Sequence, residues 1–402
     1  MAKFSRRHFV GLTAAGLAAG LVAPRFAFAD GTATATPAPT AAATATAGPL
    51  PPAPAPGPID LKAAGGMDAL IAAAKKENLL AVITLPDDWS NYGEVKKTFL
   101  AKYGLQLSDL NPDGSSGDEI AAIKANAGNT GPQNPDVVDV GFIWGDQAKT
   151  AGLLQPYKVA TWDTIPASLK DADGFYWGDY YGTMSFIVNA DIVKNIPQDW
   201  SDLLKPEYKG LIALGGDPTA ASQAEHAVWA AALANGGSLD DATPGLNFFA
   251  KLATAGNLSG AIASSASVGK GDTPIALVWD FNALSWRDAN QKNANIQVVY
   301  PAGGSIAGVY LQAINAYAPR PNAARLWQEF LYSDEGQLLW LKGYAKPVRF
   351  DDLMKRGVIP ADLLAKLPKA NVKVGFPTPA QIKKALTTIA TGWPTVVAPN
   401  LK

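Results

Sequence analysis

The chain has 402 residues, of which 48% are hydrophobic and 17% are charged, a balance typical of a folded globular protein. Its length allows two or three domains at roughly 150 residues each. With 34 basic and 35 acidic residues it lacks the basic excess that nucleic acid binding requires. The absence of cysteine excludes disulfides, thiolate metal sites, cysteine nucleophiles and lipidation of an N-terminal cysteine.

The first 29 residues have the features of an export signal. The segment SRRHFV (5–10) places two arginines before a short apolar stretch, and AFA (27–29) supplies the small residues of a cleavage site. The same segment resembles the twin-arginine export motif, which serves proteins that fold before export. We predict that residues 1–29 are a signal peptide cleaved near Ala29. Its removal leaves 30 basic and 35 acidic residues, a slightly acidic mature chain.

Residues 30–58 are a low-complexity segment of Ala, Thr and Pro with no bulky apolar residue before Leu50. Such a segment buries too little apolar surface to offset the entropy lost on ordering. We predict a disordered, extended linker that separates the folded part from the export signal.

Helical and strand patterns alternate from residue 61 to the C-terminus. In the first half, apolar residues at helical spacing predict helices, and continuous apolar runs predict buried strands. The second half continues this order without an internal repeat. Helix and strand alternation of this kind indicates an α/β fold with helices on the faces of a sheet. Helices are predicted within 66–80, at 92–104 and at 118–128, and strands at 79–85 and 135–143. A strand that runs into a turn is predicted at 182–193, and a strand, a glycine-rich turn and a long helix at 209–237. Beyond these, a strand ending in a charged and aromatic turn is predicted at 273–286, a strand followed by a helix at 309–331, and a last helix at 377–397.

The segment TLPDDWSNYG (84–93) follows a predicted buried strand and places two carboxylates beside a tryptophan. Asp87 and Asp88 are ordinary turn residues, but Trp89 is too large and apolar for a turn alone. In open α/β sheets, ligands bind beyond the carboxyl ends of the strands. The segment WGD (144–146) follows another predicted strand in the same way. Both segments are therefore candidate parts of a binding site.

The segment IPQDWSDLLKPEYKGLIALGGDP (196–218) resembles a pattern of the periplasmic solute-binding proteins of ABC importers, in the group for iron, spermidine and putrescine, thiamine and phosphonates. Further similar segments are LIAAAKKENLLAVIT, DVVDVGFIWGDQAKTAGLLQPY, FIVNADIV and AINAYAPRPNAARLWQEFLYSDEGQ. The resemblance covers about residues 60–402. The matching residues of the main pattern are Pro197, Trp200, Asp202, Leu203, Pro206, Lys209, Gly210, Ile212, Asp217 and Pro218.

This resemblance implies a type II binding-protein fold, in which two α/β lobes joined by two crossover strands hold the ligand in the cleft between them. We place the crossovers near 182–183 and 309–311. Lobe one is then 59–182 plus 309–348, and lobe two is 183–308 plus 349–402. The resemblance also implies a membrane permease with a cytoplasmic ATPase as partner. The export signal and the absence of cysteine predict a periplasmic location, or tethering if the signal is not cleaved. We expect a monomer without a cofactor, a metal or nucleic acid.

The predicted strand ends and crossovers carry an aromatic and acidic set of residues without lysine or arginine. Aromatic faces attract cations and carboxylates bind amines, so the set favours a small organic cation. A polyamine such as spermidine or putrescine is the first expectation, and thiamine is the nearest alternative. The predicted ligand-binding residues are Asp87, Asp88, Trp89, Ser90, Trp144, Asp146, Tyr180, Tyr181, Thr219, Trp279, Asp280 and Tyr310.

Several of these residues have structural alternatives. Asp87 and Asp88 can cap a helix or hold a turn, and Trp144 and Trp279 can belong to the core. Tyr180 and Tyr181 point to opposite sides if they lie in a strand, so at most one contacts ligand. For Trp200, packing is the expected role.

Two other ligand classes remain open. Helix starts at 115–117 and near Thr219 offer free backbone N–H groups, which suit an anionic or zwitterionic ligand such as 2-aminoethylphosphonate. Ferric iron is less favoured, because the iron binders of this group carry adjacent tyrosines where this chain has residues 279–282. A metal site made of carboxylates alone also stays open.

The sequence does not favour an enzyme. His226 is the only histidine after residue 29, and the chain lacks the HExxH, GxSxG and Walker motifs. A hydrolase that uses two carboxylates is the alternative enzyme class. A tethered sensor that presents the same cleft to a receptor is the third class.

Overall fold

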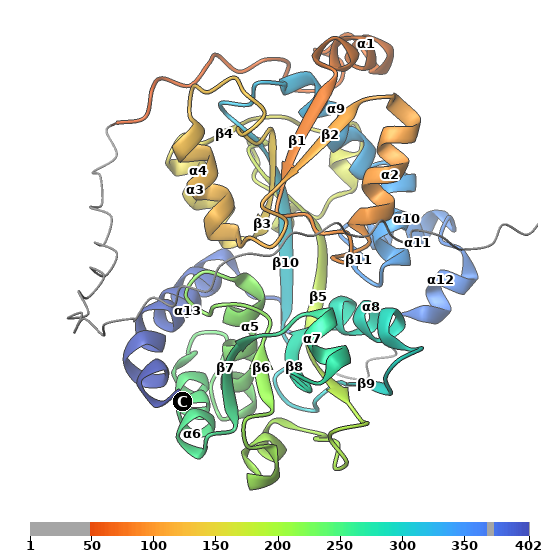
Figure 1. The fold of residues 1–402 in the computed structure, drawn as a ribbon. Coiled ribbons are helices and arrows are strands. Elements are labelled where there is room, and N and C mark those ends of the chain that lie inside the picture. The colour runs from red at the N-terminus through yellow and green to blue at the C-terminus, as the bar shows by residue number, and fades with distance from the viewer. Residues whose placement is uncertain (1–48, 368–373, 402) are drawn as a thin grey trace, which may run out of the picture. The chain divides into compact units, whose positions relative to one another are not determined.

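Two long antiparallel strands, β5 (Trp177–Asn189) and β10 (Ala307–Asn315), run through the middle of the structure and connect its two halves (Figure 1). The structure is a computed structural model that describes residues 49–367 and 374–401. The predicted signal peptide and residues 30–48 of the predicted linker lie outside the described residues. Both strands are buried along almost their whole length, as expected for strands at the centre of a sheet.

Lobe one is the half of the structure that contains the first four strands. Strands β1 and β2 pair in parallel, and β3 and β4 pair with the upper part of β10. Its elements are α1 (Met67–Glu77), β1 (Leu79–Ile83), α2 (Tyr92–Tyr103), β2 (Gln106–Leu110), α3 (Ser116–Asn126), β3 (Val137–Gly141), α4 (Ile143–Thr150), β4 (Leu154–Gln155), η1 (Trp162–Thr164), η2 (Ala167–Leu169), α9 (Pro321–Leu331), α10 (Asp334–Lys342) and β11 (Lys346–Pro347).

Lobe two is the half that contains β6 to β9. Strand β6 pairs in parallel with both β7 and β8, and β8 and β9 pair with the lower part of β5. Its elements are η3 (Trp200–Leu204), η4 (Pro206–Tyr208), β6 (Ile212–Leu214), α5 (Ser222–Ala234), α6 (Thr243–Ala255), β7 (Leu258–Ile262), α7 (Ser265–Lys270), β8 (Ile275–Trp279), α8 (Asp280–Asn290), β9 (Ile296–Val299), α13 (Pro379–Gly392), η5 (Trp393–Val397) and η6 (Ala398–Asn400).

The sheet order brings the two halves together at the crossover strands. The described strands β3, β10, β5, β8, β6 and β7 are neighbours in this order, and β4, β9 and β11 pair with the two crossover strands outside it. In the register of β5 and β10, Gly182 lies opposite Gly308. The parallel strands β1 and β2, and β6 and β8, end at loops that face the space between the lobes. The fold therefore directs its strand-end loops toward one cleft.

The chain after β11 packs against both lobes. Helices α11 (Phe350–Arg356) and α12 (Ala361–Lys366) pack on α10 of lobe one through an apolar cluster that includes Leu341 and Leu353. Arg349 and Arg356 both bind Asp334 at the start of α10. Helix α13 contacts mainly α5 and α6 of lobe two and has a smaller contact with α4 of lobe one. These contacts differ from the domain limit predicted at residue 348, because 350–366 lies with lobe one.

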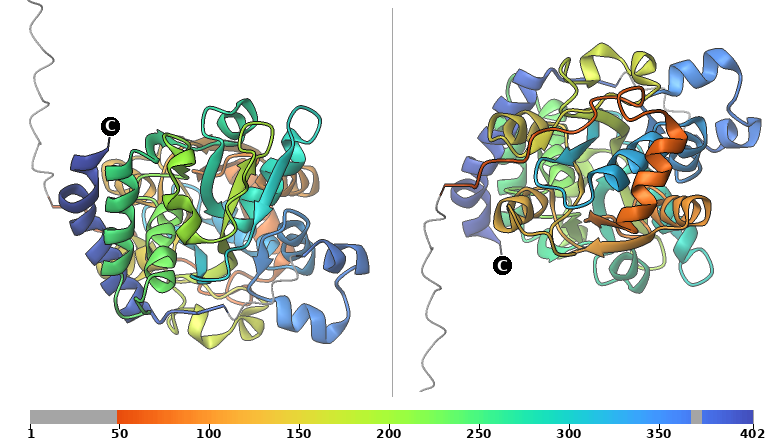
Figure 2. Two further views of the ribbon diagram at one scale, coloured as in Figure 1. Left: turned by 90° about the horizontal axis from the view of Figure 1, so that it is seen from below. Right: turned by 90° about the horizontal axis from the view of Figure 1, so that it is seen from above.

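The described end of the predicted linker, 49–58, contains no helix or strand and runs over lobe one (Figure 2, right). The Tyr317 hydroxyl donates to the Pro51 carbonyl at 2.8 Å, and Arg325 Nε donates to the Pro58 carbonyl at 2.9 Å. This part of the segment is thus held by the folded part, in contrast to the disorder predicted for 30–58.

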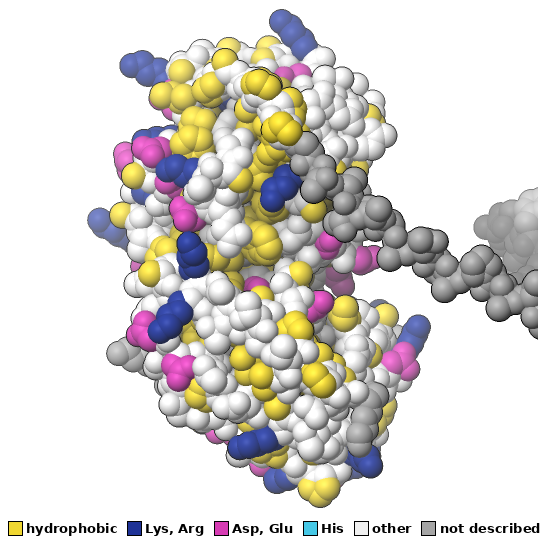
Figure 3. Space-filling model, turned by 90° about the vertical axis from the view of Figure 1, so that its left-hand side faces the viewer, with side chains coloured by type: hydrophobic (Ala, Val, Ile, Leu, Met, Phe, Trp, Pro, Cys, Tyr) yellow, Lys and Arg dark blue, Asp and Glu magenta, His cyan; other side chains and the backbone are white. Residues whose placement is uncertain are grey.

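Most predicted elements are present with shifted ends. The strand predicted from 182 begins at Trp177, and the helix predicted from residue 118 begins at Ser116, where the N-cap Ser115 forms a capping box with Asp118. The prediction lacks several elements, among them strands β2 and β7 and helices α4, α6, α7 and α10, and where it places a turn after β8 the structure has helix α8. The indole of Trp200 is buried between Phe186 and Phe248, in agreement with a packing role. On the face shown in Figure 3, basic and acidic side chains are interspersed.

Candidate ligand-binding site

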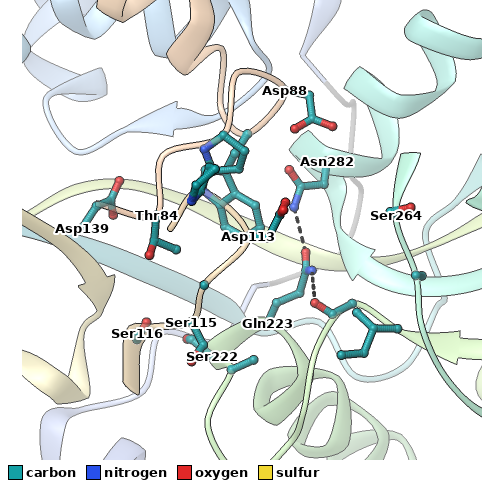
Figure 4. Close-up of a pocket in the computed structure, with 18 of the residues that line it drawn as sticks. Thr84, Asp88, Asp113, Ser115, Ser116, Asp139, Ser222, Gln223, Ser264 and Asn282 are labelled. Atoms are coloured by element: carbon teal, nitrogen blue, oxygen red, sulfur yellow. Dashed lines mark hydrogen bonds between the residues drawn. The ribbon is translucent and has the colours of Figure 1, made fainter. Parts of the chain in front are cut away.

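A cavity of about 260 Å³ lies between lobe one and lobe two (Figure 4). Lobe one contributes the loops after β1 and β2, the start of α3 and the end of β3. Lobe two contributes the loop after β6 and the starts of α5, α7 and α8, and Tyr310 comes from β10. The lining residues are Thr84, Pro86, Asp88, Trp89, Pro112, Asp113, Gly114, Ser115, Ser116, Glu119, Asp139, Gly215, Ala221, Ser222, Gln223, Ile262, Ala263, Ser264, Ser265, Asn282, Trp286 and Tyr310.

The described residues that line the cavity carry four carboxyl groups and no lysine, arginine or histidine. Asp88 and Asp113 are exposed at its edge, and Glu119 and Asp139 are buried in its wall. Partial burial raises the pKa of Asp88, and the charges of Asp113 and Asp87 raise it further. The repulsion among these carboxylates is relieved when a cation enters, so the electrostatics of the cavity favour positive ligands.

Asp139 is one of the two buried carboxyl groups of the cavity. Its Oδ2 accepts hydrogen bonds from the hydroxyls of Tyr92 and Tyr180, the latter at 3.1 Å, whereas Oδ1 has no partner among the described residues. Burial raises the pKa of Asp139 to about 7, although the two phenol donors act in the opposite direction. Burial also raises the pKa of Glu119, which accepts the Asp139 N–H at 2.9 Å.

Trp89 forms an aromatic wall of the cavity. Its Nε1 donates to the Tyr180 hydroxyl at 2.7 Å, and its ring meets the rings of Phe281 and Tyr310 edge to face. Tyr180 in turn donates to Asp139, so the indole of Trp89 and the buried carboxyl belong to one hydrogen-bond chain. The tryptophan in the loop after β1 is thus held by the crossover strand β5.

The lobe-two side of the cavity is built on Gln223, near the start of α5. Its Oε1 accepts from the backbone N–H of Trp279 and from Asn282 Nδ2, both at 2.9 Å, and its Nε2 donates to the Gly215 carbonyl at 3.1 Å (Figure 4). Gly215 follows β6, Trp279 ends β8, and Asn282 lies in the first turn of α8. Gln223 therefore ties these strand ends together and presents Asn282 to the cavity.

Of the twelve residues predicted to bind ligand, Asp88, Trp89 and Tyr310 line the cavity. Tyr180 and Trp279 do not line the cavity but contact residues that do. Both are fully buried, and each forms a hydrogen bond to an aromatic residue of the cavity wall. In these positions they hold Trp89 and Tyr310 in place.

The other seven lie outside this cavity. Asp87 pairs with Lys96 at 2.9 Å, Ser90 is buried, and Asp280 accepts from the backbone and side chain of Thr183 at 3.0 and 2.8 Å. Trp144 and the exposed Asp146 lie on α4. Tyr181 and Thr219 line two different surface hollows. Tyr180 and Tyr181 point to opposite sides, as the alternation of a strand requires.

The residues that the prediction missed come mainly from the segment 112–119, from β3, and from the segments that lead into α5, α7 and α8. Asp113 follows β2, a strand whose mixed sequence QLSDL lacks a clear apolar pattern. Asp139 interrupts the apolar run VVDVG, and this buried acid in a strand was the available signal. Ser115, Ser116 and Ser222 line the cavity at helix starts, and the first two lie in the segment that we considered for an anion.

Comparison with known proteins identifies the family. Residues 133–374 match the family described as bacterial extracellular solute-binding protein, and this match spans more than half of the chain. The chain belongs to this family. An uncharacterized protein of Haemophilus influenzae is 31% identical over 141 residues, which cover 32% of this chain and 38% of that protein. The chain thus matches well under half the length of this curated relative.

Solved structures share the fold over most of this chain. The periplasmic binding protein P5PA has a TM-score of 0.63 at 19% identity, covering 80% of this chain and 99% of that chain. The periplasmic binding protein AfuA of Actinobacillus pleuropneumoniae, with bound fructose-6-phosphate, has a TM-score of 0.62 at 22% identity, covering 79% and 98%. The spermidine/putrescine-binding protein PotD of Streptococcus pneumoniae has a TM-score of 0.51 at 18% identity, covering 71% and 87%.

These comparisons confirm the predicted family and its two-lobe α/β fold. Proteins of this family bind small solutes in the periplasm or outside the cell, work with ABC permeases, and are binding proteins rather than enzymes. Within 49–367 and 374–401, no helix has the length and apolar character needed to cross a membrane. The same residues contain no group of three or more His, Asp or Glu side chains arranged for a metal ion.

Proposed function

We propose that this solute-binding protein captures a small organic cation, with a polyamine such as putrescine or spermidine as the first choice. The observation that carries this proposal is the charge of the cavity, whose described lining residues include four carboxyl groups and no lysine, arginine or histidine. Binding of an ammonium group between carboxylates forms charge-assisted hydrogen bonds, which are about twice as strong as neutral ones.

The aromatic residues of the cavity suit the rest of such a ligand. Trp89, Trp286 and Tyr310 line it from both lobes and from β10. A cation near an aromatic face gains about 0.5–2 kcal/mol, and methylene groups gain from contact with the same rings. Thiamine, which combines aromatic rings with a positive charge, is the alternative cation.

We also propose the path of the protein in the cell from its N-terminal sequence. A twin-arginine signal peptide, cleaved near Ala29, would export the folded protein to the periplasm. There the binding protein would deliver its ligand as a monomer to a membrane permease with a cytoplasmic ATPase. If the signal stays uncleaved, the segment 30–58 would tether the protein to the membrane.

A zwitterion such as 2-aminoethylphosphonate is the second candidate. The starts of α3 and α5 both face the cavity, and Ser115, Ser116 and Ser222 add hydroxyl groups there. Free backbone N–H groups at helix starts favour anions. The proximity of Asp88 and Asp113 opposes an anion without an amine, so a ligand with both charges fits this candidate best.

A thermal-shift experiment with the full chain tests the proposal. The panel contains putrescine, spermidine, thiamine, choline, 2-aminoethylphosphonate, fructose-6-phosphate and ferric citrate. A ligand that binds only the folded protein raises the melting temperature as its concentration rises. We expect polyamines to do so for the native protein, and Trp89→Ala to abolish the effect.

The matched control is Trp162→Ala, because Trp162 is a partly buried tryptophan outside the cavity. This variant should keep the response to polyamines. A response to 2-aminoethylphosphonate alone would replace the first candidate by the second. A response only to fructose-6-phosphate or ferric citrate would show that the organic-cation proposal is wrong.

A further inference from the structure

Two buried oxygen atoms on opposite walls of the cavity have no hydrogen-bond partner among the residues that the structure describes. They are Asp139 Oδ1 in lobe one and Asn282 Oδ1 in lobe two, and both residues line the cavity. Asp139 is 4% exposed and Asn282 is 0% exposed. A buried polar atom without a partner costs free energy, so such atoms in a binding cavity indicate groups that a ligand satisfies.

The free oxygen of Asp139 follows from the contacts of its other oxygen. The hydroxyls of Tyr92 and Tyr180 both donate to Oδ2. Tyr92 also accepts from Gln312 Nε2 at 3.0 Å, which directs its own proton toward Asp139. With the carboxyl group held in this way, Oδ1 is left for a donor that the described side chains do not supply.

The orientation of the Asn282 amide follows from a chain of backbone contacts. The backbone N–H of Trp279 donates to Gln223 Oε1, and Gln223 Nε2 donates to the Gly215 carbonyl. Because an N–H must donate and a carbonyl must accept, these two contacts determine which end of the Gln223 amide is the oxygen and which is the nitrogen. Because Gln223 Oε1 is an acceptor, the atom of the Asn282 amide that contacts it must be the nitrogen Nδ2. This orientation leaves Asn282 Oδ1 without a partner among the described residues. Both unsatisfied atoms in the cavity wall are therefore acceptors.

We propose that the ligand carries two N–H donor groups and bridges the lobes, with an ammonium group at Asp139 Oδ1 and a second N–H donor at Asn282 Oδ1. This inference rests on the proposed function and assigns two residues to ligand recognition. It favours an α,ω-diamine over a monoamine, because a monoamine leaves one of the two acceptors without a partner.

The surroundings of Asp139 explain why the charged end of the ligand belongs there. The groups packed against this carboxyl are Tyr92 from α2, Glu119 from α3, Asp179 and Tyr180 from β5, and Tyr310 from β10. None of them is positively charged. An ammonium ion is thus the group that compensates an ionised Asp139, whereas the neutral amide of Asn282 needs only a hydrogen-bond donor.

Calorimetric titration of the full chain with matched ligands tests this inference. The ligands are putrescine, butylamine and 1,4-butanediol, which have the same four-carbon chain with two, one and no amino groups. For the native protein we expect putrescine to bind roughly tenfold more tightly than butylamine, and butanediol not to bind. Equal affinities for putrescine and butylamine would overturn the two-donor arrangement without any variant.

Two substitutions test the residues. Asp139→Asn keeps an acceptor for the two phenols and removes the charge, and we expect it to weaken putrescine binding at least about tenfold. Asn282→Ala should bring the affinity for putrescine close to that for butylamine. Asp146→Asn, an exposed aspartate on α4, is the control and should leave both affinities unchanged.

The outcomes separate this inference from the proposed function. If no amine binds the native protein, the organic-cation proposal is wrong and the inference falls with it. If putrescine binds the native protein and Asp139→Asn equally well, the cation proposal stands and the role of Asp139 is overturned. A melting temperature for each variant shows whether it is folded before its affinity is compared.

Discussion

Asp139 combines two properties that a ligand-binding carboxylate needs. Its phenol partners hold it in one orientation, and its burial makes the ionised form unfavourable until a cation arrives. Asp88 and Asp113 are exposed and solvated, so they attract a cation to the cavity with less discrimination. At the scale of the residue, specificity is therefore expected from the buried acid and attraction from the exposed ones.

The raised pKa of Asp139 predicts a pH dependence of ligand binding. Because an ammonium group binds the carboxylate, a proton competes with it below the pKa of about 7. We expect the dissociation constant for putrescine to rise as the pH falls from 8 to 5.5, approaching tenfold for each pH unit at the low end. Titration calorimetry at several pH values measures this slope.

Asp139→Asn is the control for this prediction and should flatten the profile. An equal slope in both proteins would assign the dependence to another group, such as Asp88. In the ligand-free protein, a rise in pH has the opposite effect: it lowers the stability of the fold, whereas it strengthens ligand binding. The folded protein holds a proton on Asp139 up to about pH 7, whereas the unfolded chain loses it near 3.8, so this group lowers stability as the pH rises between these values.

The crossover strands β5 and β10 are joined at a pair of glycines beneath the cavity. Gly182 lies opposite Gly308, and the rings of Phe281 and Trp279 fill the space that side chains at these glycines would occupy. These rings pack against each other, and Trp279 also hydrogen-bonds to Tyr310 in the cavity wall. At the scale of the element, the missing side chains of the two glycines leave room for Phe281 and Trp279 against the strand pair, and Trp279 in turn contacts the aromatic wall of the cavity.

Gly308→Ala should therefore destabilise the protein. A Cβ atom at this position would lie 1.9 Å from Trp279 Cη2, which forces the indole or the strand to move. We expect a loss of about 1–3 kcal/mol in the free energy of unfolding, measured by urea titration. Gly260→Ala in β7 is the matched control, because a Cβ atom there meets no atom within 4 Å. Equal stability of the two variants would contradict this packing argument.

The two lobes also contact each other at the rim of the cavity. The Tyr344 hydroxyl, after α10 of lobe one, hydrogen-bonds to Asp288 on α8 of lobe two. Ser285 on the same helix donates to the Asp88 carbonyl at 3.4 Å. At the scale of the whole molecule, these contacts hold the lobes together over the cavity.

Loss of the Tyr344 contact should speed ligand release. We expect Tyr344→Phe to increase the dissociation rate of putrescine roughly two- to tenfold, because one interlobe hydrogen bond is lost. Stopped-flow tryptophan fluorescence measures this rate. Tyr317→Phe removes the hydrogen bond to Pro51, away from the cavity, and should leave the rate unchanged. The same rate in both variants would show that the Tyr344 contact does not restrain the lobes.

The sequence by itself determined the fold class and the family resemblance, and it directed attention to three residues, Asp88, Trp89 and Tyr310, that line the cavity. Apolar runs such as LLAVI report burial, and the residues that follow such a run must leave the sheet at its edge. This reasoning correctly placed Asp88 and Trp89 at the end of a strand, and both line the cavity. It depends only on neighbours along the chain, which is why it succeeded.

Only the tertiary structure decided which side chains meet. Asp280 follows a strand just as Asp88 does, yet Thr183 of the crossover strand occupies its carboxyl group. Asp139 lies in the middle of an apolar strand, yet it borders the cavity, where β3 runs beside α3. Sequence periodicity reports whether a residue is buried, whereas its partners come from segments distant in the chain. The free oxygens of Asp139 and Asn282 exist because of those partners, so the sequence alone could not reveal them.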